Sequence, residues 1–276
     1  MTVLQSDLAA ILRRLHGEVC DTLANLSPDD AQEIRGTNAK GDHQRNFDLA
    51  ADATVRRFLE EEFDGGIVLS EESKEHRFGL VEPVYRFVID PVDGSDNWSR
   101  GLPLSSLSIA VLPVEAPIAL NQVIAALTGD LEREDAPVCV RGDGAYRGVN
   151  RIRTASTRKI KHAFVSCELN HFAPTLQLGA LFASARAVRS YGCASRAIVL
   201  VAEGSIDAHI DVRERLTPES FLAAAAILQE AGGCLLDARG NPLPAFTDLR
   251  QRTTIVAAAT EELAREIIET LNSTRH

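Results

Sequence analysis

Two carboxylates, Asp90 and Asp93, follow directly on an apolar run at residues 87–89. The apolar run predicts a buried strand, and the chain is expected to turn sharply at Gly94 before a helix that begins near Ser95. A strand end with two carboxylates beside a helix N-terminus offers hard oxygen ligands for Mg²⁺ next to backbone N–H groups that suit a phosphate. These residues predict chemistry on a phosphate ester.

Two amphipathic helices and a second strand are predicted to position these carboxylates. Apolar residues recur at helical spacing over residues 4–26 and 49–63, and both segments keep a polar face. The polar, turn-rich segment 36–46 between them predicts a loop. A short apolar run at 67–69 predicts another strand, which ends in a pair of glutamates. Two acidic strand ends are therefore expected in the first part of the chain.

The later part of the chain alternates predicted strands with predicted helices. Strands are predicted at residues 107–112, 122–127, 138–141, 163–166, 207–212 and 234–237, with a glycine hairpin turn at 142–148. Helices are predicted at residues 176–184, 194–203, 218–231 and 260–272. This order predicts a layered α/β or α+β fold with a soft boundary near residue 149. Residues 1–149 form the half with the acidic motifs, and residues 150–276 complete the site.

Composition and charge narrow the classes of function. The chain of 276 residues has a formal net charge of −10, which argues against nucleic acid as a partner because such binding needs a basic surface. Its five cysteines are scattered without a Cys-x-x-Cys pair, which argues against a disulfide framework or a zinc site. The N-terminus lacks the pattern of a signal peptide, and the longest apolar stretch is broken by prolines. We therefore expect a cytoplasmic protein without a membrane partner.

The upstream acidic pairs each have a structural interpretation. Asp48 and Asp52 lie four residues apart near the start of a predicted helix, where carboxylates commonly cap the helix and pair with its dipole. We favour this interpretation for Asp52. In isolation, Glu71 and Glu72 are typical of a solvated turn. Because successive strand residues point to opposite faces, only one of the two glutamates is expected to face a cleft.

Residues 90–95 resemble the Asp-Pro-(Ile/Leu/Val)-Asp-Gly-(Thr/Ser) signature of the inositol monophosphatase and fructose-1,6-bisphosphatase superfamily. The order of further motifs strengthens the resemblance over nearly the whole chain. These motifs are Ser-Glu-Glu-Ser at 70–73, Gly-x-Gly-Ala-Tyr at 142–146, Arg-Ser-x-Gly-Cys-Ala at 189–194 and Glu-Ala-Gly-Gly at 230–233. The resemblance implies an αβαβα sandwich and, commonly, a homodimer or a homotetramer.

The resemblance implies a site for two or three Mg²⁺ ions. Asp90 is expected to bridge two ions, the Val92 backbone carbonyl to complete one site, and Asp93 to bind the second ion. Glu71 is the expected ligand of the glutamate pair, and Asp48 corresponds to a residue that helps hold an additional ion in the superfamily.

The resemblance also implies how the substrate is bound and attacked. Glu71 and the Ser95 hydroxyl are expected to orient the attacking water, so Glu71, Asp90, Asp93 and Ser95 are the predicted catalytic residues. The predicted phosphate- and substrate-binding residues are Asp93, Gly94, Ser95, Gly192, Cys193, Ala194, Asp211 and Arg213. Among these, Asp211 would accept hydrogen bonds from sugar hydroxyls, and Arg213 would meet a second phosphate.

One position departs from the family pattern. Most relatives carry an acidic metal ligand ten residues before the Glu230 equivalent, and this chain has Ser220 there, preceded by Glu219. Glu219 substitutes after a shift in the helix start, or the second metal site is weaker and keeps water, or the chain binds without turnover. We favour the first two interpretations, because the other metal residues are intact.

The sequence thus predicts a Mg²⁺-dependent phosphomonoesterase for a small phosphorylated polyol or sugar, either inositol monophosphate or fructose 1,6-bisphosphate. An alternative enzyme acts on another phosphate ester, such as a 3′-phosphonucleotide or histidinol phosphate. The rival of a different class is a catalytically impaired sugar-phosphate-binding paralogue, which Ser220 would explain.

Overall fold

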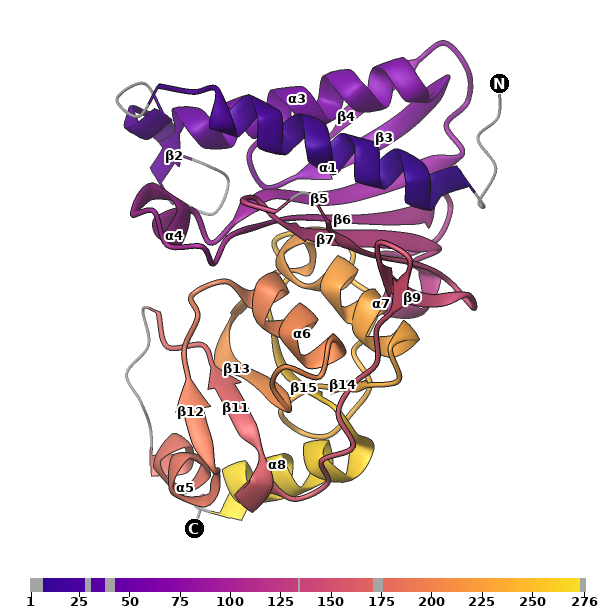
Figure 1. Cartoon of the computed structure of the whole chain (residues 1–276). Helices are drawn as coiled ribbons and strands as arrows, with labels where there is room; N and C mark the ends of the chain where they lie inside the picture. The colour runs from indigo at the N-terminus through magenta and orange to yellow at the C-terminus, as the bar shows by residue number, and fades with distance from the viewer. Residues whose placement is uncertain (1–6, 28–30, 38–42, 134, 171–175, 274–276) are drawn as a thin grey trace.

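The chain folds into five alternating layers of helix and sheet (Figure 1). The computed structural model describes residues 7–27, 31–37, 43–133, 135–170 and 176–273. An outer pair of helices, an eight-stranded sheet, a middle pair of helices, a five-stranded sheet and a second outer pair of helices follow one another. This arrangement confirms the predicted αβαβα sandwich.

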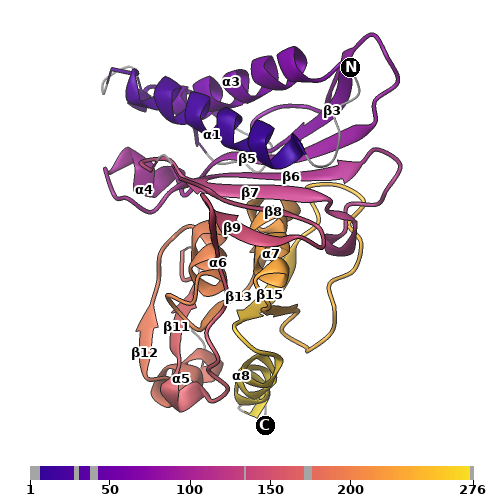
Figure 2. The same cartoon turned by 45° about the vertical axis from the view of Figure 1, so that its right-hand side comes forward.

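Each helical layer contains two main helices. The outer layer on the first sheet contains α1 (Leu8–Ala24) and α3 (Asn46–Glu62). The middle layer contains α6 (Ala194–Ala202) and α7 (Leu222–Glu230), which Figure 2 shows between the two sheets. The far layer contains α5 (Leu176–Ser184) and α8 (Glu261–Ser273).

The first sheet brings the two acidic strand ends together. Its strand order is β10-β9-β8-β7-β6-β5-β3-β4. The strands are β3 (Gly65–Ser70), β4 (His76–Gly79), β5 (Tyr85–Asp93), β6 (Ser106–Pro113), β7 (Ala125–Asp130), β8 (Pro137–Val140), β9 (Gly144–Arg147) and β10 (Asn150–Arg151). Only β3 and β5 are parallel neighbours among them. Parallel neighbours end at the same edge of a sheet, so Glu71 after β3 lies near the end of β5.

The second sheet has the strand order β12-β11-β13-β15-β14. Its strands are β11 (Phe164–Cys167), β12 (Ala187–Arg189), β13 (Ala208–Leu216), β14 (Cys234–Leu236) and β15 (Thr253–Ala258). Strand β11 is parallel to β12 and β13, whereas β15 is antiparallel to β13 and β14. Three short 3₁₀ turns complete the connections: η2 (Leu120–Gln122), η3 (Ile160–His162) and η4 (Pro218–Ser220).

Three apolar cores hold the layers together. One core packs α1 and α3 against the first sheet, and another packs α5 and α8 against the second sheet. The middle core joins side chains of both sheets, such as Val88 and Ile255, around the fully buried alanines of α7. Small side chains on α7 allow the two sheets to approach this helix closely from opposite sides.

Several element predictions need correction. The segment predicted as a loop at 36–46 contributes to a two-stranded antiparallel sheet of β1 (Ile34–Thr37) and β2 (His43–Arg45), and residues 38–42 lie outside the described residues. The helix predicted over 218–231 is the turn η4 followed by α7. Strands β4, β12 and β15 were not predicted, because they are short or lack a period-two apolar pattern.

The predicted division into residues 1–149 and 150–276 stays a prediction. The first sheet ends at β10 and the second begins at β11, yet the middle core contains residues of both halves. Within the described part of the chain, no helix is both long and apolar enough to cross a membrane.

Burial of His209 on β13 makes the stability of the fold depend on pH. Its Nδ1 lies 3.2 Å from the Ser166 hydroxyl. Burial is the main cause that lowers the pKa of His209 to about 4, with Asp211 acting in the opposite direction and Arg213 in the same direction. The unfolded chain therefore binds the proton first, so this contribution to stability is full above about pH 6.5 and is lost as the pH falls towards 4. Between pH 7 and pH 5, the loss amounts to about 2 kcal/mol.

We expect His209→Gln, which keeps a polar partner for Ser166, to remove this part of the pH dependence. Urea unfolding at pH 7 and pH 5 of both proteins measures the difference. The native chain should lose about 2 kcal/mol more than the variant between the two pH values. Equal losses in the two proteins would show that His209 titrates normally in the folded state.

Candidate active site

The end of β5 is irregular at the two aspartates. Pairing with β6 shifts between Asp90 and Asp93, and Gly94 then adopts the left-handed conformation with φ of +83° before helix α4 (Ser95–Ser99). A Cβ atom at Gly94 would lie 2.9 Å from the Leu104 carbonyl oxygen, so both the conformation and the close approach require glycine. The turn therefore places both carboxylates beside the first N–H groups of α4, as predicted from the sequence.

Asp93 is fixed by the N-terminus of helix α6. Its Oδ2 accepts hydrogen bonds from the Ser195 backbone N–H at 2.7 Å, the Ser195 hydroxyl at 2.6 Å and the Cys193 thiol at 3.3 Å. The Ser106 hydroxyl lies 2.7 Å from the Ser195 hydroxyl and extends this network into β6. Burial raises the pKa of Asp93, while these donors act in the opposite direction. The network orients Asp93 between the two halves of the chain.

Asp48 joins the start of α3 to the turn at residues 92–95. One carboxylate oxygen accepts the Arg45 backbone N–H at 2.9 Å, and the other lies 3.0 Å from the Ser95 hydroxyl. The same hydroxyl lies 2.9 Å from the Val92 carbonyl oxygen. Burial, together with the nearby negative charge of Glu71, raises the pKa of Asp48 to about 6, although the hydrogen bonds from Arg45 and Ser95 act in the opposite direction. The capping function expected for this helix therefore belongs to Asp48.

Asp52 instead fixes the loop that carries the two glutamates. It is buried, accepts hydrogen bonds from Ser70 at 2.6 Å and Ser73 at 3.4 Å, and pairs with Arg56 at 3.0 Å. These contacts hold the segment from both sides of the glutamate pair. The capping interpretation of Asp52 is corrected: its carboxylate binds the strand end rather than the helix start.

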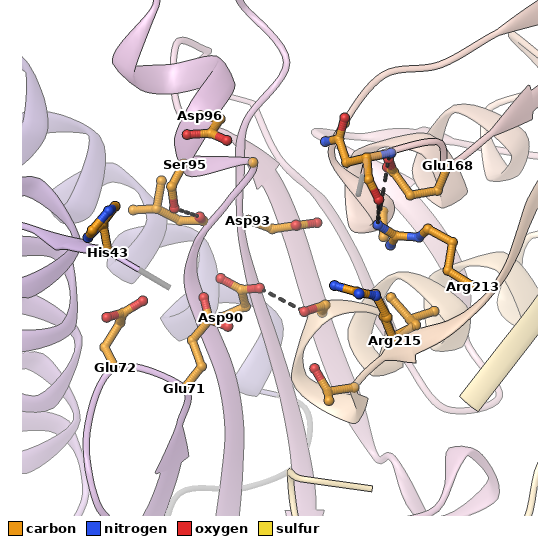
Figure 3. A pocket seen from close by; sticks show the side chains of 18 of the residues that line it. His43, Glu71, Glu72, Asp90, Asp93, Ser95, Asp96, Glu168, Arg213 and Arg215 are labelled. Carbon is orange, nitrogen blue, oxygen red and sulfur yellow. Dashed lines mark hydrogen bonds and ion pairs between the residues drawn. The ribbon is translucent and has the colours of Figure 1, made fainter. Parts of the chain in front are cut away.

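Both glutamates line the cleft, contrary to the expectation that only one would do so. Gln44 donates hydrogen bonds to the Glu72 carboxylate at 2.6 Å and to the Glu72 carbonyl oxygen at 2.8 Å. Glu71 is close enough to Asp48 and Asp93 to raise the pKa of each. In Figure 3, Glu71 lies on the side of Asp90 and Glu72 on the side of His43. The alternation rule fails here because the pair lies beyond the last residue of β3.

A cleft of about 440 Å³ separates this acidic wall from residues of the second half of the chain. Among the residues predicted for the site, the cleft-lining ones are Glu71, Asp90, Val92, Asp93, Gly94, Ser95, Gly192, Ala194 and Arg213. Further lining residues that the sequence did not single out for the site are His43, Asp96, Glu168, Asn170, Arg215, Thr217 and Arg252. Of these, only Glu168, a carboxylate directly after the apolar β11, carries a strand-end signal.

Ser220 rather than Glu219 is among the residues that line the cleft. The Ser220 hydroxyl donates a hydrogen bond of 3.1 Å to Asp90 Oδ2. Glu219 is buried and accepts a hydrogen bond of 2.6 Å from the Thr217 hydroxyl. A metal-ligand role for Glu219 therefore stays a prediction.

Asp211 and Cys193 support the cleft from behind and are not among its lining residues. Asp211 is fully buried and accepts hydrogen bonds from Arg213 Nε at 3.0 Å and Nη2 at 2.7 Å. Arg213 Nη1 also donates to the Asn170 carbonyl oxygen at 2.9 Å. The guanidinium group is thus held by the protein on several sides, and Asp211 reaches sugar hydroxyls only after releasing it.

The donor set fits a hard divalent cation. Glu71, Asp90 and Asp93 bring carboxylates to one cleft, and the Val92 carbonyl lies between the two aspartates in sequence. Within the described ranges, no three His, Cys, Asp or Glu side chains form a preassembled metal cluster. Mg²⁺ keeps several waters and usually binds through one or two carboxylates, so an open set of oxygen donors suits it. Closed structural zinc sites use Cys and His instead.

A layered αβαβα fold with strand-end carboxylates facing a cleft has the architecture and the donor groups that a metal-dependent phosphatase needs. The chain belongs to the inositol monophosphatase family, whose model matches residues 5–276. It is 28% identical over 251 residues to a fructose-1,6-bisphosphatase/inositol-1-monophosphatase of Methanothermobacter thermautotrophicus. This similarity covers 89% of this chain and 89% of the relative. A protein of the same name from Thermococcus kodakarensis is 30% identical over 244 residues, covering 87% of this chain and 88% of the relative.

The fold is similar to a solved structure of the extragenic suppressor protein suhB from Bartonella henselae. The TM-score is 0.81 at 20% sequence identity, and the similarity covers 96% of this chain and 98% of the other. The fold and the family together establish a phosphatase, and metal dependence is general in this family.

Proposed function

We propose that the chain is a Mg²⁺-dependent phosphomonoesterase that hydrolyses a small phosphorylated polyol or sugar, either inositol monophosphate or fructose 1,6-bisphosphate. The observation that carries this proposal is the meeting of Glu71, Asp90 and Asp93 in one cleft beside the start of α4. The names of the two archaeal relatives, which combine both substrates, support the same substrate class.

We assign the metal site to Glu71, Asp90, Asp93 and the Val92 carbonyl, with Asp48 and Glu219 as the predicted additional ligands. When bound, two or three Mg²⁺ ions would neutralise the phosphate and activate a water molecule. The chain contributes orientation: the Ser195 and Cys193 donors hold one oxygen of Asp93, which leaves its second oxygen for the cleft. Ser220 does the same for Asp90 by binding its Oδ2.

The start of α4 is proposed to bind the phosphate. The first N–H groups of a helix have no partner within the helix, and here Gly94 and Ser95 bring such groups into the lining of the cleft. The Ser95 hydroxyl, held between Asp48 and Val92, and the Glu71 carboxylate are proposed to orient the attacking water. Glu71 is also proposed to accept a proton from that water. Because the water attacks phosphorus directly, the reaction needs no covalent protein nucleophile.

The rival binding-only function has one observation in its favour. Ser220 occupies Asp90 Oδ2 with a neutral hydroxyl where most relatives have an acidic ligand. A sugar-phosphate-binding paralogue would keep the proposed phosphate site at the start of α4 but would no longer hydrolyse its ligand. A homodimer or homotetramer, expected from the family resemblance, stays a prediction.

Phosphate release with Mg²⁺ across a panel of substrates tests the proposed function. The panel contains inositol 1-phosphate, fructose 1,6-bisphosphate, adenosine 3′,5′-bisphosphate and histidinol phosphate. We expect hydrolysis of at least one of the first two at a rate well above that of the last two. Hydrolysis of only adenosine 3′,5′-bisphosphate or histidinol phosphate would overturn the substrate class, and binding of a sugar phosphate that is recovered intact would favour the paralogue.

A further inference from the structure

The two walls of the cleft differ in their charged groups. One wall presents the carboxylates proposed for metal together with Arg45. The other wall, from the second half of the chain, presents Glu168 and three arginines: Arg213, Arg215 and Arg252. Figure 3 shows Arg213 and Arg215 across the cleft from Asp90 and Glu71. When the scissile phosphate lies at the acidic wall, the alcohol part of the ester extends towards the arginines.

Arg213 is not available to a substrate anion in this arrangement. Its guanidinium group pairs with Asp211 at 2.7 Å and lies 3.9 Å from Glu168, so its charge is shared between two buried carboxylates. Glu168 also accepts the backbone N–H groups of residues 169 and 170, each at 2.9 Å. Arg213 therefore balances the charge of this wall rather than adding positive charge to the cleft.

Arg215 and Arg252 differ from Arg213 in this respect. Both are exposed and line the cleft, and neither has a hydrogen bond or an ion pair with any other residue that the structure describes. Figure 3 shows the guanidinium group of Arg215 pointing into the cleft. Two exposed arginines in one cleft that pair with no described residue provide a site for an external anion.

The sheet brings these two arginines together. Leu216 at the end of β13 pairs with Thr253 at the start of β15, and each arginine directly precedes one member of that pair. In an antiparallel pair, the residues before Leu216 and before Thr253 lie diagonally across the two strands rather than opposite each other, a spacing of about 7–8 Å. Both long side chains line the same cleft and can reach one ligand from there, although 36 residues lie between them in the sequence.

The backbone around Arg215 is also unusual. Glu214 is the only non-glycine residue among the described ones with a positive φ, 56°. The pairing of β13 with β15 is irregular between Asp211 and Leu216. Non-glycine residues in this conformation are strained and cluster at ligand sites, where the surrounding structure maintains the strain. The irregular segment directs Arg213 and Arg215 to the same cleft while keeping Arg213 on Asp211.

We propose that Arg215 and Arg252 form a subsite for a second phosphate on the alcohol part of the substrate, so that the enzyme prefers a sugar bisphosphate to a polyol monophosphate. The inference rests on the proposed phosphatase function and narrows its substrate class. It assigns the second phosphate to Arg215 and Arg252 rather than to Arg213.

Fructose 1,6-bisphosphate and fructose 1-phosphate test this subsite, because they share the scissile phosphate and differ only in the second one. The native chain should hydrolyse the bisphosphate with a kcat/KM at least about tenfold higher, the effect of one or two charge-assisted hydrogen bonds. Arg215→Gln and Arg252→Gln should each lower the ratio of the two kcat/KM values about tenfold, and the double variant should abolish the preference.

The matched control is Arg239→Gln, since Arg239 is exposed and does not line the cleft. This variant should keep the native ratio. Equal kcat/KM values in the native chain, or an unchanged ratio in the double variant, would overturn the subsite and leave the phosphatase function intact.

A chain that hydrolyses none of the proposed substrates overturns the proposed function, and calorimetry then decides the subsite separately. Fructose 1,6-bisphosphate in Mg²⁺ should bind at least tenfold more weakly to the double variant than to the native chain. Equal binding, or no binding to either protein, would overturn the subsite.

Discussion

Replacing Asp93 by Asn is expected to lower kcat for the preferred substrate by at least about 10³-fold, about 4 kcal/mol of transition-state stabilisation. The amide oxygen of Asn can still accept the hydrogen bonds from Ser195, so the position of the side chain is retained. What is lost is the negative charge towards the cleft, which we propose binds a metal ion. Because burial disfavours the ionised form of Asp93 and raises its pKa, removing the charge should not destabilise the fold.

The measurement is kcat at saturating substrate over a series of Mg²⁺ concentrations, together with the melting temperature of each protein. Asp96→Asn is the matched control, because Asp96 also lines the cleft but is exposed and paired with Arg45 at 3.2 Å. We expect the control to retain activity within about threefold, as for the loss of an exposed ion pair. An Asp93→Asn protein that keeps a tenth of native activity at an unchanged melting temperature would rule out the metal-based mechanism at this residue.

The sequence alone predicted the acidic end of β5 correctly because the features that build it are local. An apolar run, two carboxylates and a glycine with positive φ follow one another within eight residues, and each has a strong local preference. The alternation of helical and strand periodicities along the chain predicted only a layered α/β or α+β fold, and the order of the five layers came from the family resemblance. Asp90, Asp93 and Glu71 meet because β3 and β5 are parallel neighbours in the sheet.

The opposite wall of the cleft was not predictable in the same way. Arg252 precedes a strand that shows no clear apolar alternation, and it reaches the cleft only because β15 pairs with β13. Arg213 was predicted to meet a phosphate, but a sequence cannot show that Asp211 binds the guanidinium group with both oxygens. Such contacts depend on tertiary packing rather than on spacing.

The geometry of the short turn η4 determines which of two residues, Ser220 or Glu219, takes the position of the third acidic ligand. An α-helix starting at Pro218 would rotate successive residues by about 100°, whereas the 3₁₀ turn η4 rotates them by about 120°. In η4, Ser220 reaches Asp90 and Glu219 turns back to Thr217. We therefore expect Ser220, rather than Glu219, to control the strength of the proposed metal site.

We expect Ser220→Asp to make the protein less stable in the absence of Mg²⁺ and to raise its affinity for Mg²⁺. Without Mg²⁺, the new carboxylate faces Asp90 in a buried place and replaces a hydrogen bond by a like-charge contact, which should lower the free energy of unfolding by about 2 kcal/mol. With Mg²⁺, the same carboxylate adds a ligand, so the Mg²⁺ concentration for half-maximal activity should fall about tenfold. Urea unfolding with and without Mg²⁺ measures how much Mg²⁺ binding stabilises the folded protein, and this measurement does not depend on turnover.

Ser220→Ala is the control for the lost hydrogen bond. It should cost about 1 kcal/mol of stability at any Mg²⁺ concentration and leave the Mg²⁺ requirement near that of the native chain. If Ser220→Asp shows no gain in stability on addition of Mg²⁺ beyond that of Ser220→Ala, position 220 does not face a metal ion. If the native chain is silent and only Ser220→Asp hydrolyses a sugar phosphate, the native protein is a binding paralogue whose catalytic residues are otherwise intact.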